Sequence, residues 1–160
     1  MSKVETIATH FLYPSNLFVG TTHTEVTTVL GSCISVCLYD QVKKIGGINH
    51  YMLPFWNGQG LASVKFGNIA IERLIKEMYR KNCKPENMIA KIFGGANQVD
   101  FTARIGDRNA EVARDMLKEY GIRLVAHNTG GQRGRKIIFD TVSGVVRMKF
   151  VGKAKQTGGE

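Results

Sequence analysis

Two amphipathic segments interrupt a series of short β-branched runs, and this order restricts the chain to a mixed fold. The segment FGNIAIERLIKEMYRKN (66–82) repeats apolar residues at helical spacing with charges on the opposite side. DRNAEVARDMLKEYG (107–121) predicts a second helix, with Asp107 as its N-cap and Gly121 as its stop. Runs rich in Val, Ile and Thr predict strands at 24–30, 33–39, 44–53, 87–93, 122–128, 135–140 and 144–150. The pattern indicates an α+β or α/β domain.

The length of 160 residues suits a single domain with one sizeable core. We expect residues 1–150 to form that domain. Residues 151–160 carry no large apolar residue after Val151 and are expected to form a flexible tail.

The net charge and the hydropathy of the chain limit the kinds of molecule that it can bind and where it is found. Lys and Arg number 22 against 13 Asp and Glu, which gives a net charge of +9. This excess favours an acidic partner such as nucleic acid, an anionic membrane or a Glu-rich protein, although a solvated basic surface is equally compatible. No zinc finger, helix-turn-helix or aromatic stacking platform supports nucleic-acid binding. No run approaches the roughly 18–20 apolar residues that span a bilayer, and the first 16 residues do not resemble a signal peptide, so we expect a cytoplasmic protein.

The stretch TTVLGSCISVCLYD (27–40) raises the main functional question, because Cys33 follows a Gly-Ser pair. The thiol can be a buried hydrophobe, a metal ligand, half of a disulfide or a nucleophile. Three cysteines in a reducing compartment argue against a disulfide framework, and we interpret Cys37 and Cys83 as buried structural residues. For Cys33, a Gly-Ser turn can aim backbone N–H groups at one point, lower the thiol pKa and hold an oxyanion.

A metal site is disfavoured by spacing. On a strand, Cys33 and Cys37 would lie about 13 Å apart at roughly 3.3 Å per residue, too far to share one ion. The sequence also has no CxxC pair and no HExxH motif. We therefore expect neither a metal nor a cofactor.

A nucleophilic cysteine needs a base, and His50 is the best placed of the four histidines. A hairpin closed over residues 40–43 sets Cys33 directly opposite His50 on one face, whereas a one-residue slip would move His50 to the other face. His10, His23 and His127 are interpreted as surface or structural residues. Spacing alone leaves the group that orients His50 open between hydroxyl and polar side chains nearby: Thr27, Thr28, Asp40 and Asn49.

Several motifs in order resemble the CheD family of bacterial chemoreceptor glutamine deamidases. LGSC leads into ISVCLYD, and GGINHYMLP places its histidine 17 positions after the cysteine. Gly94-Gly95-Ala96 after a strand, IGDRN (105–109) at a helix start and GGQRGRKIIF (130–139) extend the resemblance over about residues 15–150.

The resemblance implies an α+β fold, with β-sandwich-like mixed sheets flanked by helices, similar to the catalytic domain of deamidating toxins. It implies a protein-glutamine glutaminase with a Cys-His-Thr triad on Cys33, His50 and Thr27. The substrates would be glutamine side chains on the cytoplasmic helices of methyl-accepting chemotaxis receptors, and the phosphatase CheC would be a protein partner. The alternative is a non-catalytic regulatory module for CheC. A basic surface would speed encounter with Glu-rich receptor helices, and we expect Arg133, Arg135 and Lys136 to contact substrate or partner.

Overall fold

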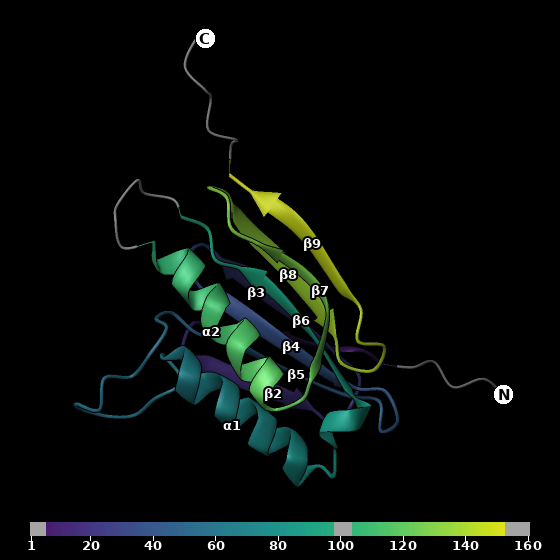
Figure 1. Cartoon of the computed structure of the whole chain (residues 1–160). Helices are drawn as coiled ribbons and strands as arrows, with labels where there is room; N and C mark the ends of the chain where they lie inside the picture. The colour runs from purple at the N-terminus through teal and green to yellow at the C-terminus, as the bar shows by residue number, and fades with distance from the viewer. Residues whose placement is uncertain (1–5, 98–103, 153–160) are drawn as a thin grey trace, which may run out of the picture.

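The computed structural model describes residues 6–97 and 104–152, which form three layers (Figure 1). A four-stranded sheet has the order β1-β3-β8-β9, and a five-stranded sheet has the order β2-β5-β4-β6-β7. Both helices cover one face of the five-stranded sheet, and the four-stranded sheet lies on its other side. The strands are β1 (Ala8–Phe11), β2 (Asn16–Gly20), β3 (Thr24–Leu30), β4 (Ile34–Asp40), β5 (Ile45–His50), β6 (Met88–Gly94), β7 (Arg123–Thr129), β8 (Gly134–Asp140) and β9 (Val146–Val151); the helices are α1 (Gly67–Arg80), α2 (Ile105–Glu119) and a 3-10 turn, Pro85–Asn87.

The expected α+β sandwich with flanking helices is confirmed, and every predicted strand and helix is present close to its expected bounds. No strand was predicted for β1 or β2, because all four residues of β1 are exposed and β2 is mostly half-buried, so neither carries a clear apolar alternation. The N-cap prediction was wrong. Helix α2 starts at Ile105 with Arg104 at the N-cap, and the Asp107 carboxylate accepts hydrogen bonds from Asn97 and Arg104 instead. Val151 ends β9, and the expected tail beyond Gly152 lies outside the described residues.

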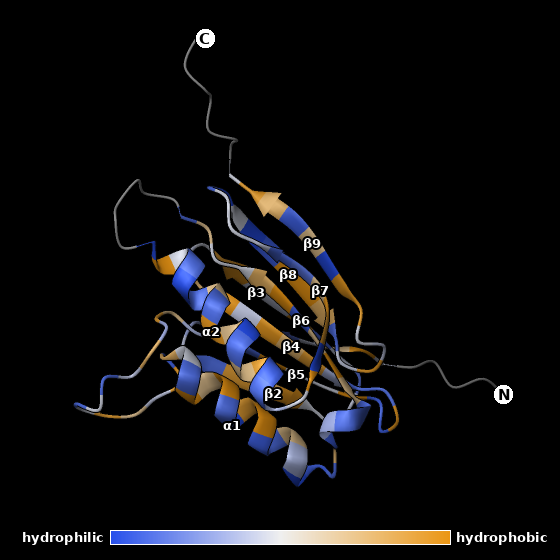
Figure 2. Cartoon of the chain, in the orientation of Figure 1, coloured by the Kyte–Doolittle hydropathy of each residue, from blue (hydrophilic) through white to orange (hydrophobic). Residues whose placement is uncertain are grey.

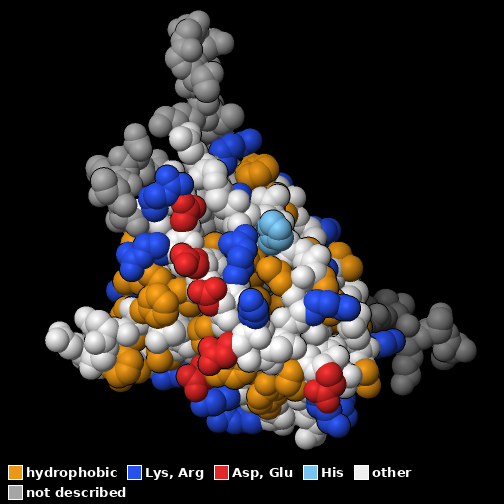
Figure 3. Space-filling view, in the orientation of Figure 1, with side chains coloured by type: hydrophobic (Ala, Val, Ile, Leu, Met, Phe, Trp, Pro, Cys, Tyr) orange, Lys and Arg blue, Asp and Glu red, His pale blue; other side chains and the backbone are white. Residues whose placement is uncertain are grey.

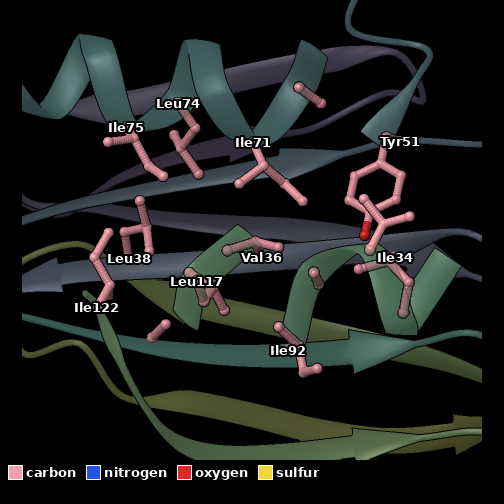
Figure 4. Close-up of a cluster of buried hydrophobic side chains, with 14 of the residues drawn as sticks. Ile34, Val36, Leu38, Tyr51, Ile71, Leu74, Ile75, Ile92, Leu117 and Ile122 are labelled. Carbon is pink, nitrogen blue, oxygen red and sulfur yellow. The ribbon is translucent and has the colours of Figure 1, made fainter. Parts of the chain in front are cut away.

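The larger core lies between the helices and the five-stranded sheet (Figure 4). Both helices alternate apolar and polar residues along their length (Figure 2), and the buried positions of α1 are Gly67, Ala70, Ile71, Leu74, Ile75 and Met78. They meet Ile34, Val36 and Leu38 of β4, which have no exposed surface. Each large aliphatic side chain buried here stabilises the fold by roughly 1.5–3 kcal/mol.

A second core lies between the two sheets and explains why β4 is buried throughout. Alternate residues of a strand point to opposite faces, so β4 supplies Ile34, Val36 and Leu38 to the helix side and Cys37 to the inter-sheet side. The inter-sheet cluster consists of Leu12, Val26, Leu30, Cys37, Ile48, Phe93, Ile137 and Phe139. Cys37 and Cys83 are both buried, as the sequence predicted.

The surface is mixed in charge on the face that carries the helices, where acidic side chains lie among groups of Lys and Arg (Figure 3). Along residues 6–97 and 104–152, neither helix combines the length and the apolar character that a bilayer-crossing segment needs.

Candidate active site

Cys33 lies where the chain crosses from one sheet to the other. Strand β3 belongs to the four-stranded sheet and β4 to the five-stranded sheet, and Gly31–Cys33 connects them. Backbone groups after β6 hold this turn: the Gly95 N–H donates to the Cys33 carbonyl at 2.8 Å, and the Ala96 N–H donates to the Gly31 carbonyl at 2.9 Å. The thiol itself is only partly buried and packs against the inter-sheet core.

Gly94 makes this support possible. Its φ is +108°, and a Cβ built on it would lie 2.2 Å from the Cys33 carbonyl oxygen. Only glycine permits both the backbone conformation and the close approach. The Gly94-Gly95 pair that supported the family resemblance therefore supports the backbone of Cys33 directly.

The predicted hairpin register was wrong by two residues, yet Cys33 and His50 still lie on the same face of the sheet. Cys37 pairs with Ile48 and Asp40 with Ile45, rather than Cys33 with His50. The Asp40 carboxylate accepts from the N–H groups of Val42 and Lys43, so Asp40 still belongs to the strand and the turn occupies residues 41–44. Because side chains alternate with period two, a shift of two residues preserves the face on which each side chain lies.

Cys33 and His50 consequently point to the same side of the five-stranded sheet. Ile34 and Tyr51 form a bridge and both belong to the helix-side core, so their neighbours Cys33 and His50 face the opposite side. In this register the two catalytic candidates are diagonal neighbours across the β4–β5 pair, a separation of about 7–8 Å between backbone positions that an imidazole can bridge.

A short hydrogen-bond chain fixes the His50 ring. The Thr28 hydroxyl lies 2.7 Å from His50 Nδ1 and 2.7 Å from the Leu12 carbonyl oxygen. A carbonyl can only accept, so the Thr28 hydroxyl donates to Leu12 and its oxygen accepts from Nδ1–H. This arrangement leaves the lone pair on Nε2. Nε2 is buried and has no hydrogen-bond partner among the described residues, so it is available as a base.

The geometry favours Thr28 over Thr27 as the orienting residue. Thr28 is fully buried between the sheets, whereas Thr27 is half-exposed on the other face of β3. The other two candidates are occupied elsewhere: Asp40 caps the hairpin turn, and the Asn49 side-chain oxygen accepts from the Val36 N–H. Of the remaining histidines, His23 bonds to Asp140, His10 stacks on Phe18, and His127 is exposed on β7.

Burial keeps both candidate groups neutral. It lowers the pKa of His50 from 6.5 to about 4, so the imidazole is uncharged at neutral pH. Burial also raises the pKa of Cys33, and the residue's own backbone N–H, which faces the sulfur, offsets this only in part. The sequence-based expectation of a lowered thiol pKa is therefore wrong for the free protein.

The basic loop residues differ in burial: Arg133 and Lys136 are half-buried, and Arg135 is buried. Arg135 is only 3% exposed, and its guanidinium donates to Asn128, Gly94, Gly130 and Arg133, so it holds the loop after β7 against the end of β6. The expectation that Arg133, Arg135 and Lys136 contact substrate or partner stays a prediction; for Arg135, the four internal hydrogen bonds speak against it. Within residues 6–97 and 104–152, no three His, Cys, Asp or Glu side chains gather in a way that would hold a metal ion.

Comparison with known proteins identifies the family of this chain. The family model described as CheD chemotactic sensory transduction matches residues 52–150. A protein of Sulfurimonas denitrificans named "Probable chemoreceptor glutamine deamidase CheD" is 46% identical over 149 residues, which cover 91% of this chain and 96% of the relative. The chain belongs to the CheD family. A CheD relative of the same name from Trichlorobacter lovleyi is also 46% identical, over 94% of this chain and 93% of its own.

The fold of this CheD chain is also found among distant solved structures. A Neisseria meningitidis protein of the DUF152 family superposes with a TM-score of 0.51 at 13% identity, over 79% of this chain and 65% of that chain. At that identity the likeness concerns the fold alone.

Proposed function

We propose that this chain is a chemoreceptor glutamine deamidase in which Cys33 is the nucleophile, His50 the general base and Thr28 the residue that orients His50. The observation that carries the proposal is the Leu12–Thr28–His50 chain, which leaves the buried Nε2 unprotonated and without a partner. Cys33 lies on the same side of the sheet, and the CheD relatives bear the matching name.

The reaction begins from a neutral pair. Cys33 Sγ attacks the carboxamide carbon of a substrate glutamine while His50 Nε2 takes the thiol proton, so charge separates only as the new bond forms. The tetrahedral intermediate carries an oxyanion, and we propose the Cys33 backbone N–H as its donor. A single such donor is worth about 10²–10³ in rate.

Collapse of the intermediate completes the deamidation. The Nε2 proton passes to the leaving nitrogen, ammonia departs, and a thioester joins Cys33 to the substrate side chain. His50 then takes a proton from water, which attacks the thioester, and glutamate is released with the thiol restored. Thr28 is a neutral acceptor, so it orients the imidazole and stabilises the transient imidazolium less than a carboxylate would.

The substrate we propose is the set of glutamine side chains on the helices of methyl-accepting receptors, with the reaction taking place in the cytoplasm. Such helices are rich in Glu, and a net charge of +9 favours their encounter with the enzyme. Because the helix-bearing face mixes both signs of charge (Figure 3), we propose that steering comes from the whole molecule and not from that face.

Mass spectrometry of receptor fragments tests the function. The wild-type chain should convert specific glutamines to glutamates with release of ammonia, and Cys33→Ala should abolish this without loss of fold. Cys83→Ala is the matched control, because it removes a buried thiol at the far end of α1. Conversion at an undiminished rate by Cys33→Ala would refute the assignment of the nucleophile.

We also propose CheC as a binding partner, which the resemblance implies. Size-exclusion chromatography of the two purified proteins should show a complex. A complex that forms while wild-type chain shows no turnover on any receptor fragment would favour the regulatory-module alternative.

A further inference from the structure

The side-chain amide of Asn109, in helix α2, joins the two catalytic segments. Its Nδ2 donates to the Ser32 carbonyl at 2.9 Å and to the Met52 carbonyl at 3.0 Å. Ser32 directly precedes Cys33, and Met52 follows His50 by two residues. Because both partners are carbonyls, which only accept, the nitrogen end of the carboxamide must be the end that faces them.

The placement of Asn109 carries a cost in stability. The side chain is fully buried, and its Oδ1 has no hydrogen-bond partner among the described residues. A buried acceptor without a partner destabilises a fold, so a residue that served packing alone would be apolar here. What the Asn109 carboxamide supplies is two N–H donors, one to the Ser32 carbonyl and one to the Met52 carbonyl.

The Ser32 contact controls the direction of the next N–H. The Ser32–Cys33 peptide is trans, so the Ser32 C=O and the Cys33 N–H point in opposite directions from one rigid plane. A carbonyl held toward α2 turns the Cys33 N–H away from α2, toward the inter-sheet side on which the Cys33 side chain packs. On the other side of the turn, the Gly95 N–H fixes the Cys33 carbonyl.

Helix α2 is itself held firmly enough to act as a reference point. The Tyr51 hydroxyl donates to the Asn109 carbonyl at 2.6 Å. At the start of the helix, a Cβ on Gly106 would lie 2.2 Å from the Gly95 carbonyl oxygen, so the helix approaches the backbone that supports Cys33 as closely as glycine allows.

We infer that Asn109 is a positioning residue, which holds the Ser32 carbonyl so that the Cys33 N–H is aimed at the oxyanion of an acyl-transfer intermediate. The inference rests on the proposed role of Cys33 as nucleophile. It goes beyond the triad because Asn109 touches neither Cys33 nor His50 through its side chain: it acts through the Ser32–Cys33 peptide.

Two reagents separate this role from general damage. Acylation of Cys33 by p-nitrophenyl acetate forms a thioester through an oxyanion and expels nitrophenolate. Alkylation of the same sulfur by iodoacetamide displaces iodide from a saturated carbon and forms no oxyanion. Asn109→Leu should slow acylation about tenfold to a hundredfold, since misplaced oxyanion donors lose most of their effect. Alkylation forms no oxyanion and responds only to the fraction of thiolate, so it should change by less than about threefold.

Thr141→Val is the control variant, because it removes a buried hydrogen bond from the Thr24 N–H at the opposite end of β3 from Cys33; the ratio of its two rates should match the wild type. If Asn109→Leu does not fold, as judged by its thermal melt, Asn109→Asp keeps the shape but loses both donors, and the same split is expected. An equal fall in both rates, or undiminished acylation, would overturn the inference. A wild-type chain that is acylated at Cys33 but leaves receptor glutamines unchanged would refute the proposed function alone, whereas a wild type that resists acylation would refute both.

Discussion

Thr28 and His50 belong to different sheets, and their side chains meet at 2.7 Å in the space between them. The Thr28 hydroxyl is also 2.7 Å from the Leu12 carbonyl, and this second bond decides which way the proton on the first one points. The Leu12 carbonyl thus determines the tautomer of His50 through two hydrogen bonds, with the proton on Nδ1.

Replacing Thr28 by Val should impair the enzyme, and replacing Thr27 should not. The loss of an acceptor for a ring that becomes charged costs roughly 1.5–3 kcal/mol, or about tenfold to a hundredfold in kcat. Thr27→Val changes the same atoms on the half-exposed face of β3 and should retain near wild-type kcat. Steady-state ammonia release measures both variants. A larger loss of kcat in Thr27→Val than in Thr28→Val would assign the orientation of His50 to Thr27.

The pH dependence of deamidation should reflect a neutral base. Because burial lowers the pKa of His50 to about 4, kcat/KM should rise with pH through that value and then level off. Below it, Nε2 is protonated and cannot take the thiol proton. A pH profile measured with a soluble receptor fragment tests this, and an acid limb near the ordinary histidine pKa would contradict it.

Stability should also fall in acid, with a defined window. Unfolded His50 takes up a proton with a pKa of 6.5, whereas the folded residue does so at about 4. Between these values the unfolded state binds more protons, so the free energy of unfolding decreases as the pH is lowered from 6.5 to 4, by up to roughly 3 kcal/mol. Urea titrations at several pH values measure the slope. His50→Gln should flatten it, and an unchanged slope in that variant would assign the effect to other groups.

Alkylation should be slow at neutral pH and confined to one cysteine. The raised pKa of Cys33 leaves little thiolate, so iodoacetamide should react more slowly than with a free cysteine peptide and faster as the pH increases. Cys37 and Cys83 are buried and should stay unlabelled in the folded protein. Mass spectrometry counts the adducts. Rapid labelling at neutral pH would indicate a thiolate–imidazolium pair in the free enzyme.

Gly94→Ala should damage both the fold and the site. The added Cβ would require a left-handed alanine and would meet the Cys33 carbonyl oxygen at 2.2 Å, which we expect to cost about 1–3 kcal/mol or more. Gly58→Ala is the control, because Gly58 also has a positive φ, +87°, but no atom lies within 4 Å of the added carbon. Thermal melts and deamidation rates should separate the two variants. Equal behaviour would mean that backbone strain, not contact with Cys33, is responsible.

The sequence predicted the elements well because their signals are local. The apolar spacing of α1 and the β-branched run of β3 are each readable without knowing what they pack against. The exposed strand β1 carries no such signal, since its place depends on pairing with β3. The prediction of the hairpin register was wrong for a different reason: the Asp40 carboxylate accepts hydrogen bonds from its own turn, which spacing alone does not reveal.

For the site, the sequence pointed to Cys33 and His50 because they flank a single hairpin. Thr28 and Leu12 reach His50 only through contact between sheets, so spacing left Thr27 and Thr28 undecided. Asn109 is 77 positions from its Ser32 contact, and only the motif IGDRN hinted at its importance. A basic residue beside glycines is typical of an exposed loop, so the sequence suggested Arg135 as a contact residue. Here its side chain is buried and donates to Asn128, Gly94, Gly130 and Arg133.

Because the chain crosses between the sheets at Gly31–Cys33, the residues of the site come from both sheets. Cys33 and His50 lie on the five-stranded sheet, and Thr28, which orients the imidazole, lies on the four-stranded sheet. The rate of turnover therefore depends on how the two sheets pack against each other. A solvent additive or mutation that lets them slide by a fraction of a side chain should silence the enzyme while its circular dichroism spectrum still looks native.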